Sequence, residues 1–329
     1  MKILILSHDE VVKLLPMKEC IAVMRDALLA LASGQAHQPL RTIMRPPDAA
    51  GVMGLMPSYL SGANAAFGLK AICVFPENPA IGKDAHQGAV LLFSAETGEL
   101  QAMMNASAIT AIRTAAVSGV ATDLLAREAA DNLAILGTGV QARSHLAAMS
   151  EVRDIKQCRI ASRRMEHAEN FVEEMRRSFS FPIESASTVQ AAVAGADLIV
   201  TATNATEPIL KREWISPGAH LNLVGASRPN AREVDSSTMA AASVFVDRRE
   251  STVNESGDYI FALNEGAIGP DHIRAEIGEV LHGDKPGRTS PHEITLFKSL
   301  GLAVEDLAAA EFLYRSAKEL NAGTWVEYS

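Results

Sequence analysis

The stretch NLAILGTGVQARSHLAAMS, residues 132–150, decides the fold of this chain. Its apolar run at 133–136 is short enough for a buried parallel strand. The turn Gly137-Thr138-Gly139-Val140-Gln141-Ala142 follows at once and leads into a segment with apolar residues at helical spacing. A strand, a tight glycine turn and a helix in this order are the context that a G-x-G-x-x-A dinucleotide-binding fingerprint requires. A plain structural turn is the alternative interpretation.

Each small residue of the turn has a distinct expected task. Gly137 permits the tight turn, Gly139 lets the backbone approach a pyrophosphate, and Ala142 allows close helix–strand packing. The helix N-terminus adds N–H groups and a positive dipole end. We therefore predict a dinucleotide site whose cofactor-binding residues include Thr138, Val140 and Gln141.

Strands and helices alternate beyond this turn, which predicts an α/β fold with a Rossmann doubly wound parallel sheet. Segment 247–258 is charged and poor in glycine, so we expect a loop there. We also expect Asp271 to cap a helix that Gly283 ends. The further buried strands are expected at 158–162, 198–203, 220–225, 244–246 and 294–297.

The opening segment has no strand–helix–strand alternation and is predicted to be a separate α+β unit. It contains a helix at 17–33, several strands and a hairpin around Glu96-Thr97-Gly98. Its apolar runs lack a covering layer of their own, which favours a homodimer. The predicted domains are residues 1–118 for substrate binding and dimerisation, with 304–329 returning to it, and 119–303 for dinucleotide binding.

Composition limits the class of protein. The chain has 329 residues, a net charge of −9 and 48% apolar residues, which argues against nucleic-acid binding. Apolar runs fall short of the roughly 20 residues of a membrane span, so we expect no membrane association. Cys20, Cys73 and Cys158 lack paired spacing, so we expect neither disulfides nor a metal site. A cytoplasmic location is the resulting expectation.

The end of the second Rossmann strand discriminates between the two nicotinamide cofactors. NAD sites usually place Asp or Glu there to bind the ribose hydroxyls. This chain instead has Ser162, Arg163 and Arg164, which suit a 2′-phosphate. We predict that NADP (NADPH) is preferred, with NAD possible; the alternative is that the arginines merely begin a solvated helix.

Three cations of the opening segment lie in apolar surroundings: Arg41, Lys70 and Arg113. A buried charge without a partner is costly, so such residues are usually paired or functional. Each alone could be a structural ion pair. Together they suggest a pocket for a carboxylate.

Several motifs in a fixed order resemble those of one family. The chain is similar to the ornithine cyclodeaminase/mu-crystallin family over nearly its whole length. This resemblance implies a homodimer whose N-terminal domain forms the interface and, with the Rossmann domain, the substrate cleft. It also implies that Arg41, Lys70 and Arg113 surround the substrate carboxylate and the nicotinamide. The motifs are Gln38-Pro39-Leu40-Arg41-Thr42, Gly54-Leu55-Met56-Pro57, Arg113-Thr114-Ala115-Ala116, the glycine turn, Ala205-Thr206-Glu207-Pro208-Ile209-Leu210, Val224-Gly225-Ala226-Ser227-Arg228-Pro229, Glu255-Ser256-Gly257-Asp258 and Phe297-Lys298-Ser299-Leu300-Gly301.

Two positions indicate the branch of the family. Cyclodeaminases resemble one another in carrying a glutamate and an aspartate where this chain has Gly54 and Ser227. The mu-crystallin branch, which resembles an NADPH-dependent ketimine reductase, shares the Gly and Ser pattern. The resemblance therefore implies reduction of cyclic ketimine carboxylates, such as Δ1-piperideine-2-carboxylate or Δ1-pyrroline-2-carboxylate, to the cyclic L-amino acid.

The resulting site assignment covers both expected domains. Arg41 is expected to bind the carboxylate, Arg113 the carboxylate or a cofactor phosphate, and Lys70 to bind the carboxylate and relay a proton. Ser227 and Arg228 complete the predicted substrate-binding set, and Lys70 and Arg41 are the predicted catalytic residues. The predicted cofactor-binding residues are Arg113, Gly137, Thr138, Gly139, Val140, Gln141, Ser162, Arg163, Arg164, Thr203 and Ser227.

Other functions remain open at this point. Within the family, ornithine cyclodeaminase, alanine dehydrogenase and an open-chain imine reductase are alternatives. A crystallin-like protein that binds NADP or another ligand without catalysis is an alternative of another class. Retention of Arg41, Lys70 and Arg113 together favours an enzyme, because a purely structural protein has no physical need for them.

Overall fold

The computed structural model describes residues 2–328, and the chain divides into two compact units. The first unit comprises Met1–Thr114 and Gly301–Ser329, and the second comprises Ala115–Leu300. The division falls within helix α3 (Ala106–Leu125) and just before helix α11 (Ala303–Glu319). The two domain boundaries predicted from the sequence, after residues 118 and 303, lie within four residues of the observed ones.

The first unit is built on a mixed eight-stranded sheet in the order β16-β1-β7-β6-β5-β4-β2, with β3 paired to β4. Strands β4 to β7 form an antiparallel meander, and β1 joins β7 in parallel. The predicted hairpin is confirmed between β6 and β7, with Gly98 in the left-handed region at φ +73°. The strands are β1 (Lys2–Leu6), β2 (Ala36–His37), β3 (Thr42–Met44), β4 (Val52–Leu60), β5 (Ala66–Val74), β6 (His86–Ser94), β7 (Leu100–Asn105) and β16 (Thr324–Glu327).

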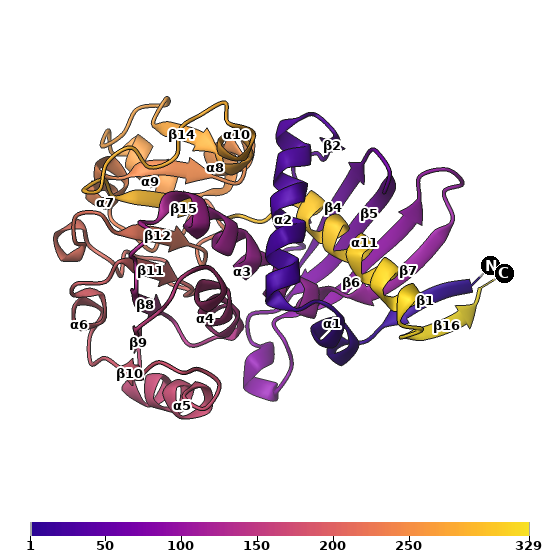
Figure 1. Cartoon of the computed structure of the whole chain (residues 1–329), viewed down its shortest axis with the longest axis horizontal. Helices are drawn as coiled ribbons and strands as arrows, with labels where there is room; N and C mark the ends of the chain where they lie inside the picture. Colours follow the sequence, from indigo (N-terminus) through magenta and orange to yellow (C-terminus); the bar gives the residue numbers. More distant parts are fainter. Residues whose placement is uncertain (1, 329) are drawn as a thin grey trace. The chain divides into compact units, whose positions relative to one another are not determined.

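Helices α2 (Met17–Ala32) and α11 lie across one face of this sheet (Figure 1). Helix α11 contacts α2 and strands β4, β5 and β6. Because side chains alternate along a strand, Gly68 and Lys70 of β5 are buried on the covered face, whereas Phe67 is 49% exposed. The short helix α1 (His8–Leu14) begins with a capping box formed by Ser7 and Glu10. The sheet is therefore covered on one side and carries exposed apolar side chains on the other.

The second unit confirms the predicted doubly wound sheet. Its strand order is β10-β9-β8-β11-β12-β15-β13-β14, and every neighbouring pair is parallel. The strands are β8 (Asn132–Leu136), β9 (Gln157–Ala161), β10 (Ile183–Ser185), β11 (Leu198–Thr201), β12 (His220–Leu223), β13 (Ser243–Val246), β14 (Ile273–Glu276) and β15 (Thr295–Lys298).

The chain order reverses beside β8, because β9 lies on one side of it and β11 on the other. Ligands of open α/β sheets bind at such a switch point, beyond the carboxyl ends of the strands. The helices are α4 (Val140–Val152), α5 (Met165–Met175), α6 (Val189–Val193), α7 (Ser236–Ala241), α8 (Arg249–Glu255), α9 (Gly257–Asn264) and α10 (Ile277–His282).

Two local predictions were wrong. Segment 247–258 is not a loop, because α8 and the start of α9 lie in it. Helix α8 has Val253 as its one apolar residue and so lacks an apolar periodicity. A contact from outside the helix holds its start, because the Arg249 N–H donates to Glu276 Oε1 at 2.8 Å. Asp271 caps no helix; residues 273–276 form β14 beside β13, and α10 begins after its N-cap Glu276.

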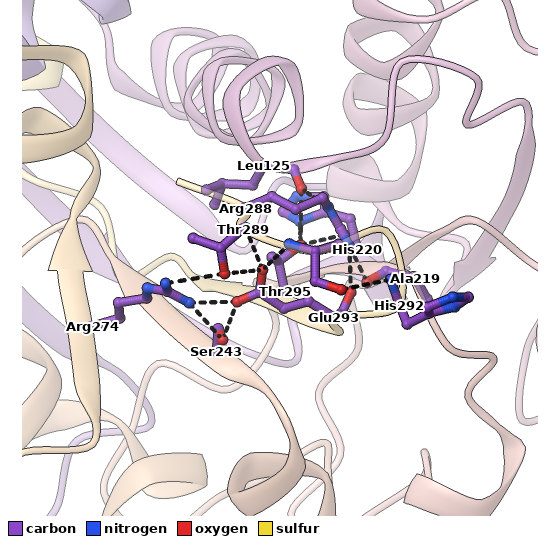
Figure 2. A network of polar contacts seen from close by, with 11 residues as sticks. Leu125, Ala219, His220, Ser243, Arg274, Arg288, Thr289, His292, Glu293 and Thr295 are labelled. Atoms are coloured by element: carbon purple, nitrogen blue, oxygen red, sulfur yellow. Dashed lines mark hydrogen bonds and ion pairs between the residues drawn. The ribbon is translucent and has the colours of Figure 1, made fainter. Parts of the chain in front are cut away.

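A polar network joins the amino ends of the central strands of this sheet (Figure 2). Arg288 donates to the Leu125 carbonyl at 2.7 Å, to Thr295 Oγ1 at 2.9 Å and to the Ala219 carbonyl at 3.2 Å. His220 Nδ1 lies 2.9 Å from Thr295 Oγ1. Burial lowers the pKa of His220 to about 3, so this histidine is neutral in the folded protein. The network ties the end of α3 to β12 and β15.

Helix α3 is long and apolar enough to cross a membrane by length and composition alone. In the structure, however, 72% of its most apolar window is buried. That burial is the mark of a core helix in a globular protein.

Candidate functional site

The glycine turn between β8 and α4 has the predicted backbone geometry. Gly137 has φ +119°, and a Cβ built there would lie 2.3 Å from the Ala202 carbonyl oxygen, so only glycine fits. A Cβ on Gly139 would meet no heavy atom of residues 2–328 within 4 Å. Ala142 is fully buried, as close packing requires. The turn therefore has a tight backbone and open space at its outer side.

Helix α4 starts at this turn with Gly139 as its N-cap residue. Its first-turn N–H groups and the dipole of the 13-residue helix favour an anion here. Arg143 Nη1 donates to the Thr138 carbonyl at 3.1 Å, and its Nη2 pairs with Glu174 at 2.6 Å. Arg143 thus braces the turn, a role that the sequence did not reveal because Glu174 lies on the next helix.

The residues predicted to select the cofactor lie on the strand next to β8. Strand β9 ends at Ala161, and Ser162, Arg163 and Arg164 follow directly. Ser162 is half-buried, whereas both arginines are exposed. Both arginines therefore directly follow the carboxyl end of the strand beside β8.

Glu233 is a buried carboxylate that the sequence analysis missed. It accepts hydrogen bonds from the Thr203 N–H at 2.8 Å, from the Thr203 hydroxyl at 2.7 Å and from the Thr201 hydroxyl at 2.7 Å. It also accepts from the Gly225 N–H at 2.8 Å. Burial raises the pKa of Glu233, and Lys298 opposes that shift. Glu233 joins the turns after β11 and β12, at the same carboxyl edge as the glycine turn.

A second buried pair supports the same edge. Lys298 Nζ lies 3.0 Å from Asp258 Oδ2 and donates to the Ala226 carbonyl at 2.6 Å. Asp258 Oδ1 in turn accepts from the Glu233 N–H at 2.7 Å. These contacts explain two of the sequence motifs, since Asp258 and Lys298 come from them. Beyond this network, Ser227 and Arg228 are exposed at the edge of the unit.

The first unit brings the predicted cations Lys70 and Arg113 to one place. Each is 3% exposed, and each is paired with an acidic residue at the start of α11. Lys70 Nζ lies 2.8 Å from Asp306 Oδ2, and Arg113 Nε lies 3.0 Å from Asp306 Oδ1. Arg113 Nη1 lies 2.6 Å from Glu305 Oε2. Both cations are thus ion-paired, and Glu305 and Asp306 are members of the site that the sequence analysis did not identify.

Arg41 belongs to the same region and contacts the turn before α11. Its Nη2 donates to the Gly301 carbonyl at 2.9 Å. Gln38 Oε1 accepts from the Val304 N–H at 2.8 Å, so two residues of one motif hold the start of this helix. Gly301 has φ +79°, and a Cβ there would lie 2.4 Å from Arg113 Nη1. The segment before β3 therefore contacts the turn before α11 and the start of that helix.

The environment of Lys70 perturbs its protonation. Burial lowers the pKa of Lys70 to about 8; Asp306 opposes this shift, and Arg113 and Arg41 reinforce it. Burial alone would raise the pKa of Asp306, but Arg113 and Lys70 hold it below its ordinary value. Lys70 therefore changes protonation near neutral pH while Asp306 stays ionised, a combination typical of functional sites.

Metal binding finds no support in the arrangement of side chains. Among the residues that the structure describes, no group of three His, Cys, Asp or Glu side chains could hold an ion.

Gly54 on β4, one of the two positions that indicate the branch of the family, lies beside apolar side chains. A Cβ there would be 3.4 Å from Ile43 Cδ1 and 3.5 Å from Ile72 Cγ2.

Known proteins were found that are similar to this chain over most of its length. Residues 1–321 match the model of the ornithine cyclodeaminase/mu-crystallin family. The chain is 39% identical over 326 residues to a Δ1-pyrroline-2-carboxylate reductase of Bacillus cereus, covering 99% of this chain and 100% of the relative. It is 44% identical over 283 residues to the ketimine reductase mu-crystallin of Mus musculus, covering 86% of each.

Solved structures show the same likeness. A Thermococcus litoralis Δ1-pyrroline-2-carboxylate reductase in complex with NADH and L-proline has a TM-score of 0.95 at 40% identity, over 98% of this chain and 99% of that one. An archaeal alanine dehydrogenase dimer with bound NAD has a TM-score of 0.93 at 32% identity, over 100% of both chains. The α/β fold and the resemblance stated from sequence are confirmed. This chain belongs to the ornithine cyclodeaminase/mu-crystallin family.

Proposed function

We propose that this chain is an NAD(P)H-dependent reductase of cyclic ketimine carboxylates such as Δ1-pyrroline-2-carboxylate and Δ1-piperideine-2-carboxylate. The observation that carries the proposal is the buried cluster of Lys70 and Arg113 with Asp306, beside Arg41, in a chain whose other unit has a dinucleotide-binding turn. Relatives that are 39% identical over 326 residues and 44% identical over 283 residues are named for this chemistry.

The cofactor fits the second unit. Gly139 leaves space for a pyrophosphate, the start of α4 offers N–H groups, and Thr203 and Ser227 stand at the same edge. When bound, the reduced nicotinamide supplies the hydride for the reduction. Ser162, Arg163 and Arg164 favour NADPH over NADH, because a 2′-phosphate gains charge-assisted hydrogen bonds that the NADH hydroxyl does not.

The residues of the first unit suit the substrate. Arg41 would bind the carboxylate through its planar fork, and Lys70 would supply a proton for the imine nitrogen. A protonated imine carbon accepts hydride with little further help, so the protein must chiefly bind, orient and exclude water. Ser227 and Arg228 are assigned to substrate contact on the strength of the family motif.

Ornithine is a poor substrate for the same site. Its second ammonium group needs an anion, and Gly54, at the position where cyclodeaminases carry glutamate, supplies no carboxylate and lies beside the apolar side chains of Ile43 and Ile72. Ser227 likewise replaces the aspartate of those enzymes. We therefore expect imine reduction without ammonia release.

The experiment follows NADPH loss at 340 nm with each cyclic imine, and ammonia release from ornithine with NAD. Ammonia release from ornithine without imine reduction would restore the cyclodeaminase assignment. Activity with L-alanine and NAD alone would move the chain to the alanine dehydrogenases. NADPH binding without turnover of any imine would favour the crystallin-like ligand-binding protein.

The uncovered face of the first unit's sheet supports a homodimer. Leu55, Phe67 and Met103 are 38%, 49% and 38% exposed on β4, β5 and β7, opposite the face that α2 and α11 cover. A second copy of the chain presents the same apolar face and can cover this one in a two-fold symmetric contact. Light scattering that finds a monomer at micromolar concentration would contradict this assembly.

A further inference from the structure

Asp306 forms ion pairs with two cations at once. It lies in the first turn of α11, is 1% exposed, and its two carboxylate oxygens have different partners. Oδ2 faces Lys70 Nζ from β5 at 2.8 Å, and Oδ1 faces Arg113 Nε from α3 at 3.0 Å. Its neighbour Glu305 pairs with Arg113 and also accepts from the Leu302 N–H at 3.1 Å. The two adjacent acids thus have different contacts.

We propose that Asp306 is a positioning residue for imine reduction: it aims the Lys70 ammonium and keeps it protonated, so that Lys70 can deliver the proton to the imine nitrogen. This inference rests on the proposed function. In the step, the lone pair of the imine nitrogen takes the Lys70 proton, the imine carbon receives the hydride with its electron pair, and the C=N π pair becomes the lone pair of the product amine; the reduced nicotinamide that supplies the hydride is oxidised. Lys70 becomes a neutral amine and regains its proton from water.

The surroundings of Lys70 make an anion necessary. The ionisable groups that act on Lys70 are Asp306 on α11, Arg113 on α3 and Arg41 before β3. His86 on β6 is influenced by Lys70, and Glu305 on α11 and Cys20 on α2 interact with Arg113. Burial and the charges of Lys70 and Arg113 lower the pKa of His86, so this histidine is neutral and adds no negative charge. Burial raises the pKa of the Cys20 thiol, so it stays neutral. Asp306 is the carboxylate in contact with Lys70.

The sign of the effect follows from these charges. Burial, Arg113 and Arg41 all lower the pKa of Lys70, and Asp306 opposes them, leaving it at about 8. Without the Asp306 charge, we expect the Lys70 pKa to fall further, so that a larger fraction of the amine is neutral at neutral pH. An opposite charge at contact distance shifts a pKa by about 1–3 units. For each unit by which the Lys70 pKa falls, the fraction of Lys70 in the protonated, proton-donating form should fall about tenfold, at any pH above both the wild-type and the variant pKa.

The test compares Asp306→Asn with Glu305→Gln as a matched control, because both changes remove one buried carboxylate charge at the start of α11. We expect the alkaline limb of kcat for Δ1-pyrroline-2-carboxylate reduction to move to lower pH by at least about one unit in Asp306→Asn. Lowering the pH should restore much of its activity. Glu305→Gln should leave that limb in place. An unmoved limb in Asp306→Asn, or an equal shift in both variants, would overturn the proposal.

A second measurement needs no turnover. Wild-type and Asp306→Asn proteins labelled at lysine ε-carbon are titrated by NMR, and the Lys70 resonance is assigned as the one missing from Lys70→Met. We expect a Lys70 pKa near 8 in wild type and a lower one in Asp306→Asn; a Lys70 pKa that is the same in both proteins overturns the proposal. This readout separates the two claims, since a protein that reduces no imine can still show the perturbed lysine.

Discussion

Replacing Arg41 with alanine should mainly raise KM for the imine carboxylate and leave kcat within a few-fold of wild type. The reason is that Arg41 binds the carboxylate equally in ground and transition states. A hydrogen bond to a charged group contributes about 1.5–3 kcal/mol. That range corresponds to a rise in KM of about 10- to 150-fold.

The structure supplies the control for this prediction. Arg41 also donates to the Gly301 carbonyl at 2.9 Å, so its loss loosens the turn before α11. Gln38→Ala removes a neighbouring contact to the same helix, the bond from the Val304 N–H, without removing a charge. Steady-state rates at 340 nm with saturating NADPH measure both variants. If Gln38→Ala raises KM as much as Arg41→Ala, or if Arg41→Ala lowers kcat alone, carboxylate binding by Arg41 is refuted.

Three further predictions concern the cofactor, the assembly and stability. Arg163→Ala should lower kcat/KM for NADPH about tenfold or more and leave NADH unchanged, since only NADPH has the 2′-phosphate; equal wild-type values for both cofactors would contradict it. Phe67→Lys should shift the dimer toward monomer in light scattering, whereas Val12→Lys, at an equally exposed apolar position on α1, should not. Arg288→Met should lower the free energy of unfolding by about 2–3 kcal/mol, measured by urea titration, because it removes the charged hydrogen bonds that Arg288 donates to the Leu125 and Ala219 carbonyls and to the Thr295 hydroxyl. Arg176→Met, which breaks an exposed pair with Glu173, should change it by less than about 0.5 kcal/mol.

Local sequence signals predicted the Rossmann unit well, because its decisive features involve neighbouring residues. Gly137 is needed for a backbone angle, and Ala142 for packing one turn later, so both are legible in a short window. The helix α8 was missed for the opposite reason. The helix is stabilised by a hydrogen bond from the Arg249 N–H to Glu276, and no residue near Arg249 in the sequence indicates that partner.

The candidate site shows the same limit. Lys70 and Arg113 were found because each is a cation in apolar sequence, but their partners lie almost 200 residues from Arg113. The signal for those partners was present, since Glu305 and Asp306 are two acids in the otherwise apolar run 303–310. The criterion that singled out the cations would have singled out the acids. Glu233 carried no such signal, because the sequence around it is polar.

The buried pairs of the first unit argue for proton delivery within the site. Lys70 and Arg113 face Asp306 and Glu305 in close pairs, so the charges of these four side chains sum to zero. Burial lowers the pKa of Lys70 to about 8, so Lys70 gives up its proton more readily than an exposed lysine does. The nitrogen of a cyclic imine needs one proton when its carbon receives a hydride, and a lysine with this pKa supplies that proton near neutral pH.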